Sequence, residues 1–152
     1  MGKSFRNSAG FGKRMEYKLI GDMLIEGLDC YVPLVDDHGV DCVIKKEDGT
    51  FIEIQIKARS KNVTDGDAAL FAAITHELKD NFYFLFFSER LDTMWILSSK
   101  EFLDECVTNK TGKNAGKHSI WFNGNRKDSS EVKKEYCKKQ FEKYICTDFS
   151  RF

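Results

Sequence analysis

The feature that most constrains the fold is a short run, residues 51–57, in which apolar and polar side chains alternate strictly. This period of two is typical of a β-strand, because successive side chains of a strand point to opposite faces of its sheet. One face of this strand carries only isoleucine, at positions 52, 54 and 56. Its other face carries three adjacent polar or charged groups, Glu53, Gln55 and Lys57. We therefore expect the polar face to line a site.

The segments before this strand predict a helix followed by a meander. Apolar residues between Met15 and Leu24 recur at helical spacing, and Gly27 is a plausible stop, since glycine is common just after a helix C-terminus. Strands are then expected over residues 28–35 and 40–46. The second of these joins the alternating strand, which extends to Arg59, through a turn that carries the Asp-Gly signal.

The second half of the chain alternates between helical and extended patterns. We expect strands at 82–88, 93–97 and 118–122, and a helix from Ser98, which has capping-box spacing with Glu101, to about residue 107. Residues 68–78 suit a short helix, and a final helix is expected to start at 128–130 with Val132, Tyr136, Phe141, Tyr144 and Ile145 on its apolar face. This order indicates an α/β (α+β) fold with a central mixed β-sheet flanked by helices.

Length and composition favour one domain over residues 1–152, with residues 1–10 as a mobile polar arm. A chain of this size buries roughly 70% of its unfolded surface. The longest apolar run, residues 82–87, is too short to cross a bilayer, and the N-terminus has no apolar core typical of a signal peptide. The five cysteines form no CxxC pair, so we expect reduced thiols, a cytoplasmic location and no membrane partner.

The zero net charge hides a segregation along the sequence. The first fifteen residues contain basic groups and no acids, residues 16–53 are mainly acidic, and residues 110–143 are mainly basic. Basic flanks around an acidic middle fit a cation site set inside a surface that binds a polyanion. The alternative is that the lysine-rich segments are simply solvated faces.

The two hairpin strands can bring Asp41 opposite Gln55 and Lys57. A carboxylate, the amide oxygen of Gln55 and the backbone carbonyl of Ile56 form an oxygen-only ligand set, which suits Mg²⁺ or Mn²⁺. Lys57 would then lie beside the metal-bound water, where its charge could stabilise an attacking hydroxide or a pentacovalent phosphate. The same spacing also occurs among ordinary charged strands.

Three pieces of the sequence together resemble the PD-(D/E)XK nuclease superfamily, over about residues 11–97. They are Glu16 on the first helix, the triplet Gly39-Val40-Asp41 at the end of one hairpin strand, and the apolar-Gln-apolar-Lys pattern of residues 54–57 on the next. The resemblance implies a restriction-endonuclease-like core and metal-dependent hydrolysis of phosphodiester bonds, usually in DNA. It also implies a homodimer, since restriction endonucleases often dimerise to cut both strands.

The resemblance also implies roles for individual residues. Asp41 would be the principal metal ligand, Lys57 the catalytic lysine, and Glu16 an auxiliary ligand or orienting group. Gln55 stands where the superfamily usually has a second acid, a departure also found in its Mrr-like and VRR-type branches. It removes a negative charge and should weaken metal affinity, for which Glu53 or Glu16 could compensate. The alternative is a catalytically inactive nuclease-like domain that binds nucleic acid or protein.

Each of these residues also has a plainer interpretation. Gly39 lies two residues before Asp41, which could simply flank a turn, and Lys57 could protect an edge strand from aggregation. Glu16 could interact only with the dipole of its helix. His38 and Cys42 lie near the site but have no third group to orient them as a nucleophilic pair.

Basic side chains outside the motif are candidates for contacts with nucleic acid. These are Arg59, Lys110, Lys113, Lys117, Arg126 and Lys127. A solvated basic loop is the alternative for residues 108–117. The residues leave open whether the nucleic acid is DNA or RNA.

Overall fold

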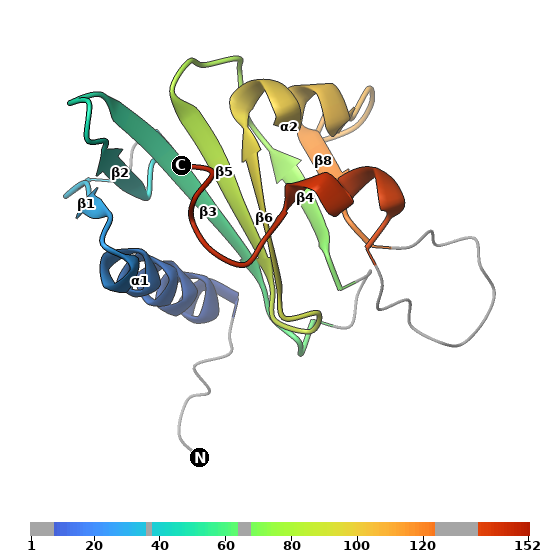
Figure 1. Cartoon of the computed structure of the whole chain (residues 1–152). Coiled ribbons are helices and arrows are strands. Elements are labelled where there is room, and N and C mark those ends of the chain that lie inside the picture. The colour runs from blue at the N-terminus through green and yellow to red at the C-terminus, as the bar shows by residue number, and fades with distance from the viewer. Residues whose placement is uncertain (1–7, 36–37, 64–67, 124–136) are drawn as a thin grey trace.

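The computed structural model describes residues 8–35, 38–63, 68–123 and 137–152 (Figure 1). In this part of the chain, the strands form a six-stranded sheet in the order β1-β2-β3-β5-β6-β9 and a three-stranded sheet in the order β4-β8-β7. The elements in chain order are α1 (Ser8–Glu26), β1 (Asp29–Tyr31), β2 (Cys42–Lys45), β3 (Phe51–Arg59), β4 (Leu70–Ile74), β5 (Phe82–Ser88), β6 (Thr93–Ser98), α2 (Ser99–Glu105), β7 (Val107–Thr108), β8 (His118–Trp121), the 3-10 helix η1 (Lys139–Tyr144) and β9 (Ile145–Cys146).

The larger sheet is mixed, as its sequence predicts. Strands β1, β2 and β3 form an antiparallel meander after the first helix, whereas β3 and β5 run parallel. The parallel register places Gln55 beside Phe84 and Lys57 beside Phe86. The predicted fold class, a central mixed sheet flanked by helices, is therefore confirmed.

Two apolar clusters cover the two faces of this sheet. Helix α1 packs Leu19, Ile20 and Met23 against the isoleucine face of β3, in a cluster of mainly aliphatic residues. The opposite face carries an aromatic cluster that includes Phe84, from β5, and Phe102, from α2. In Figure 1, α1 lies to the left of the central strands, and β4 and β8 lie to the right.

The helix boundaries show which local signals were correct. Helix α1 ends as predicted at Gly27, whose φ is +97°, and the amides of Gly27 and Leu28 donate to the carbonyls of Leu24 and Met23. The capping box of Ser98 and Glu101 is present at α2. Helix α1 begins at Ser8, so three residues assigned to the polar arm are helical; the remainder of that arm lies outside the described residues.

The predicted helix at 68–78 is wrong, because this segment contains strand β4. Leu70 and Phe71 pair with β8, and the ring centroids of Phe71 and Phe86 lie 4.9 Å apart. An isolated helix of this length is marginal in water, so packing on the aromatic face decides the conformation. Ala73 has a φ of +58°, which a right-handed helix does not allow.

The C-terminal segment differs from the predicted final helix. Its expected start, with Val132 and Tyr136, lies outside the described residues. Residues Lys139–Tyr144 form a 3-10 helix, and Ile145 belongs to strand β9. Phe141 and Tyr144 are buried, as their apolar pattern predicts, whereas Ile145 is exposed. No helix among the described residues is long and apolar enough to cross a membrane.

Candidate active site

Asp41 is fixed at the end of the β2–β3 hairpin by two hydrogen bonds to β3. Its backbone amide donates to the carbonyl of Ile54 (2.9 Å), and its carboxylate Oδ2 accepts from the amide of Ile56 (2.7 Å). Strand β2 begins only at Cys42, which pairs with Ile54, so β3 continues beyond it. The Asp41 carboxylate therefore takes the place of a strand partner for the Ile56 amide.

The carbonyl of Ile56 is directed toward the same edge. In an antiparallel pair, the N–H and C=O of one residue point to the same neighbour. Because the Ile56 amide donates toward Asp41, its carbonyl also lies on the Asp41 side of β3. A carboxylate has about four acceptor positions, so a carboxylate bonded to one amide can still bind a cation. This edge thus brings together two of the predicted oxygen ligands.

Gln55 and Lys57 project from β3 on the face opposite to the isoleucines, where they line a cleft of about 790 Å³. Gly39 lies against the side chain of Gln55 and has a φ of +68°. A Cβ at position 39 would lie 3.0 Å from Gln55 Nε2, so any larger residue would displace the amide as well as strain the backbone. The close packing of Gln55 and the positive φ therefore explain why the Gly-Val-Asp triplet has glycine at position 39.

Glu16 lies on helix α1 and is paired with Lys13, whose Nζ lies 3.1 Å from Glu16 Oε2. The pKa of Lys13 is raised, first by the hydrogen bond and charge of Glu16 and to a smaller extent by the charges of Tyr17 and Asp41. The charges of both predicted acidic ligands, Glu16 and Asp41, therefore act on Lys13. Helix α1 packs against β3, and Phe11 near its start lines a small cleft together with Lys57.

Within the described residues, no three carboxylate, imidazole or thiol groups converge on one point. A hard cation at this edge would accordingly need the amide oxygen of Gln55 and the carbonyl of Ile56 besides Asp41. Such oxygen donors are compatible with Mg²⁺, which keeps several waters. The ligand set and the role of Lys57 stay predictions.

A lysine that sequence reasoning missed lies in the same cleft. Lys79 lines it together with Gln55 and Lys57, and its Nζ lies 2.7 Å from Oε2 of Glu53 on the polar face of β3. The incorrect helix at 68–78 concealed this residue, because the segment between β4 and β5 instead forms a wall of the cleft. The signal in the sequence that could have indicated Lys79 is Glu53, a carboxylate on the polar face of β3 for which a basic partner could have been sought.

The other predicted basic residues are more dispersed. Arg59, at the end of β3, borders a smaller cleft that it shares with Lys57. Lys110, Lys113 and Lys117 lie on the loop between β7 and β8, which the bond from the Asn109 amide to the Lys117 carbonyl closes. Strand β8 pairs His118 with Ile74, a residue that lines the cleft, so the loop adjoins that end of β4. Arg126 and Lys127 lie outside the described residues.

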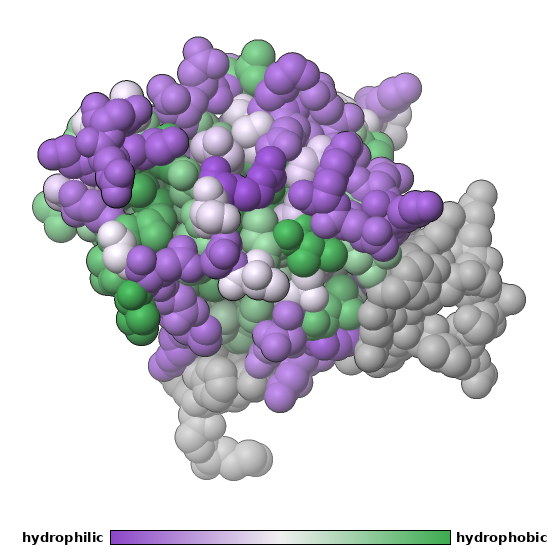
Figure 2. Space-filling view, in the orientation of Figure 1, coloured by the Kyte–Doolittle hydropathy of each residue, from purple (hydrophilic) through white to green (hydrophobic). Residues whose placement is uncertain are grey.

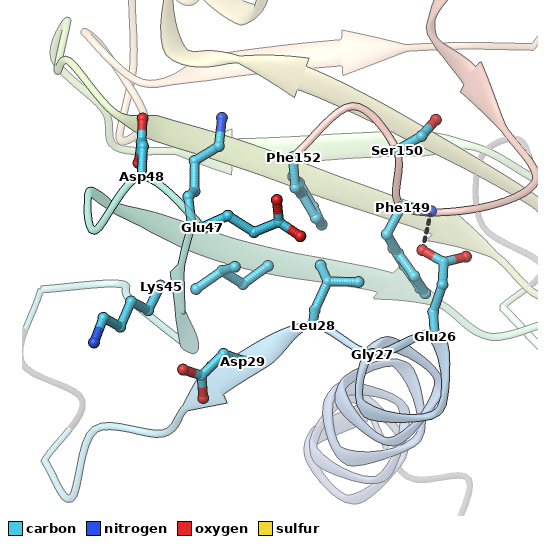
Figure 3. Close-up of a pocket in the computed structure, with 12 residues that line it drawn as sticks. Glu26, Gly27, Leu28, Asp29, Lys45, Glu47, Asp48, Phe149, Ser150 and Phe152 are labelled. Atoms are coloured by element: carbon cyan, nitrogen blue, oxygen red, sulfur yellow. Dashed lines mark hydrogen bonds between the residues drawn. The ribbon is translucent and has the colours of Figure 1, made fainter.

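A second cleft of about 800 Å³ lies at the C-terminal end of α1 (Figure 3). It is bordered by the β2–β3 turn and by residues 149–152, and the carboxylate of Glu26 accepts a hydrogen bond from the Phe149 amide (3.0 Å). Four acids and two lysines line it, namely Glu26, Asp29, Glu47, Asp48, Lys45 and Lys46. This excess of negative charge disfavours phosphate.

Comparisons with known proteins place the fold. No family model matches the sequence, and no curated protein matches it either. Among solved structures, the chain is similar to a bacterial homing endonuclease, I-Ssp6803I, with a TM-score of 0.57 and 16% identity over 82% of this chain and 84% of that chain. At this identity the likeness shows the fold alone: the chain has a nuclease-like α/β fold.

Proposed function

We propose that this protein is a Mg²⁺- or Mn²⁺-dependent nuclease of the PD-(D/E)XK type that hydrolyses phosphodiester bonds in DNA. The observation that carries the proposal is the 2.7 Å bond between the Asp41 carboxylate and the Ile56 amide. It fixes the acid of the hairpin, Asp41, against the strand segment that carries Gln55 and Lys57. The similarity to a homing endonuclease supports this choice among the chemistries that such a site could perform.

In this mechanism the chain positions charge rather than forming a covalent intermediate. Asp41, Gln55 and the carbonyl of Ile56 would hold the cation, which supplies Lewis acidity toward a phosphate oxygen. Lys57, one residue further along β3, would place its ammonium beside the attacking water and the developing charge on phosphorus. Glu16 would orient the water or complete the ligand set from helix α1.

Nuclease assays with several nucleic acids test this proposal. Duplex DNA, single-stranded DNA and RNA are each incubated with Mg²⁺, Mn²⁺ or EDTA. We expect metal-dependent cleavage of DNA that falls at least about 100-fold in Asp41→Asn and in Lys57→Ala, since each change removes a charge from the reacting centre. Lys45→Ala is the matched control, because Lys45 is an exposed strand lysine in the acidic cleft. Cleavage that persists in both site variants would contradict the proposal.

The second candidate function is a binding module without catalysis. The specific observation that favours it is Gln55, which provides an amide where a second carboxylate would be expected. Calorimetric titration with Mn²⁺ separates the two functions. Binding of the ion that is lost in Asp41→Asn supports the enzyme, whereas salt-sensitive DNA binding without binding of the ion supports the module.

We also propose a homodimer, because cutting both strands of a duplex needs two reacting centres. Hydrophobic residues reach the surface at the left of Figure 2. Exposed hydrophobic residues include Ile25 of α1 and Tyr31 of β1. Light scattering coupled to gel filtration gives the mass in solution. A mass equal to that of one chain at all concentrations would contradict the dimer.

A further inference from the structure

The cleft beside Gln55 and Lys57 is larger than a site for one metal ion requires. Its volume of about 790 Å³ falls within the range of about 300–1,000 Å³ typical of pockets for small ligands. One wall is the polar face of β3, and the other is the segment of residues 73–79, which runs from the end of β4 toward β5. The space beside the reacting centre could therefore hold one nucleotide.

Two lysines from opposite walls line this cleft together with one acid, Glu77, so that basic groups exceed acidic ones. Lys57 comes from β3, and Lys79 comes from the segment that precedes β5. The Lys79 side chain is about half exposed, and Glu53 accepts one hydrogen bond from it at 2.7 Å. An ammonium group has three donors, so a lysine oriented by one carboxylate can still donate to a phosphate. Glu53, which does not itself line the cleft, thereby orients the ammonium of a lysine that does.

The apolar part of the lining suits a sugar or a base. Ile74 and Phe82 are buried in the cleft wall, and Leu78 is 68% exposed at its border. Nucleic-acid sites commonly combine cations for the backbone with apolar or aromatic surface for bases and sugars. The cleft offers both kinds of surface within a short stretch of chain.

We propose that this cleft is the binding subsite for the nucleotide next to the cleaved phosphate, and that Lys79 binds the phosphate of that nucleotide. The inference rests on the proposed function for its choice of ligand, but it concerns binding rather than hydrolysis. It assigns a role to a residue outside the motif and makes Glu53 a positioning residue for the Lys79 ammonium.

Fluorescence anisotropy in EDTA tests the subsite without any metal-dependent step. The probe is a fluorescein-labelled duplex of about 20 base pairs, titrated between about 50 and 200 mM salt. Lys79→Ala is expected to raise Kd about 5- to 10-fold at the lowest salt and to reduce the slope of log K against log salt by about 0.9, the loss of one phosphate contact. Lys79→Arg should restore most of the affinity.

Two further variants separate this role from a structural ion pair. Lys100→Ala is the matched control, because Lys100 is an exposed lysine paired with Asp104 at 2.6 Å on α2, and it should leave Kd and slope unchanged. Glu53→Gln removes a negative charge but keeps an amide oxygen that can accept the hydrogen bond from Lys79, so the ammonium stays positioned and the salt slope should be retained. Equal losses of Tm in Lys79→Ala and Glu53→Gln, with unchanged slopes, would overturn the subsite.

The outcomes also separate the subsite from the nuclease proposal. Cleavage that depends on Asp41, together with an unchanged Kd and slope in Lys79→Ala, would leave the nuclease standing and overturn the subsite. The reverse, no cleavage but the expected loss of slope, would support the subsite and contradict catalysis. A chain that binds neither duplex nor single-stranded DNA nor RNA would overturn the subsite.

Discussion

The two faces of the central sheet differ in chemistry as well as in packing. The face beneath α1 is aliphatic, and Ile52, Ile54 and Ile56 of β3 are each at most 5% exposed there. The opposite face is aromatic over β5, where Phe71 of β4 packs on Phe86. Beside this packed region, the polar residues of β3 border an open cleft.

The difference follows from where the small sheet lies. Strand β4 covers the aromatic residues of β5 but leaves the neighbouring Gln55 and Lys57 at the cleft. One strand can therefore supply core residues at even positions and candidate catalytic residues at odd positions. Because the side chains of β3 alternate, its isoleucines contribute to folding stability and its polar residues line the candidate site. Substitutions on the two faces should therefore change different properties.

The largest expected effect is on stability and comes from the aliphatic face. Ile54→Ala removes a fully buried side chain and should lower the free energy of unfolding by about 2–5 kcal/mol. Gln55→Ala, one residue further on, should change it by less than about 0.5 kcal/mol, because its side chain borders the cleft. Urea denaturation measures both. Equal losses would mean that the two faces are not separated as described.

Much of this arrangement was predictable from the sequence. The alternation of residues 51–57 predicted the strand, and the turn signal that precedes it predicted the pairing that brings Asp41 to Ile56. Periodicity could not show that residues 68–78 pair with β8, because an apolar segment of this length suits a helix or a strand equally. The wall of the cleft, and with it Lys79, therefore required the tertiary structure.

A smaller effect, on metal affinity, is expected from introducing an acid at position 55 on the cleft face. Gln55→Glu places a second carboxylate beside Asp41 and should tighten Mn²⁺ binding about tenfold, equivalent to about 1.4 kcal/mol. Calorimetric titration against the unaltered protein measures the change. Glu53→Asp serves as a control that alters a carboxylate already paired with Lys79. No tightening in Gln55→Glu would argue that Gln55 is not a ligand.

The smallest effect concerns a titratable group on the aromatic face. His76 packs against the rings of both Phe82 and Phe84, and its Nε2 is 2.7 Å from the hydroxyl of Ser99. Burial, followed by the charges of His118 and Lys79, lowers the pKa of His76 from 6.5 to about 4. On the aliphatic face, burial instead raises the pKa of Cys42 to about 12, so that thiol does not titrate in the same range.

The sign of the resulting pH dependence follows from the depressed pKa of His76. In the unfolded chain His76 binds a proton near pH 6.5, and in the folded chain only near pH 4. The contribution of neutral His76 to the free energy of unfolding is therefore fully present above pH 6.5 and is lost as the pH falls toward 4. Because His76 is only partly buried, we expect a loss of about 1 kcal/mol from this group after allowing for solvent screening. Urea denaturation between pH 7 and 4.5 should show a smaller loss in His76→Gln, which keeps a neutral hydrogen-bonding side chain. An identical loss of unfolding free energy in the variant would mean that the acid sensitivity arises from another group. Titration on the aromatic face would then contribute no more to stability than titration on the aliphatic face.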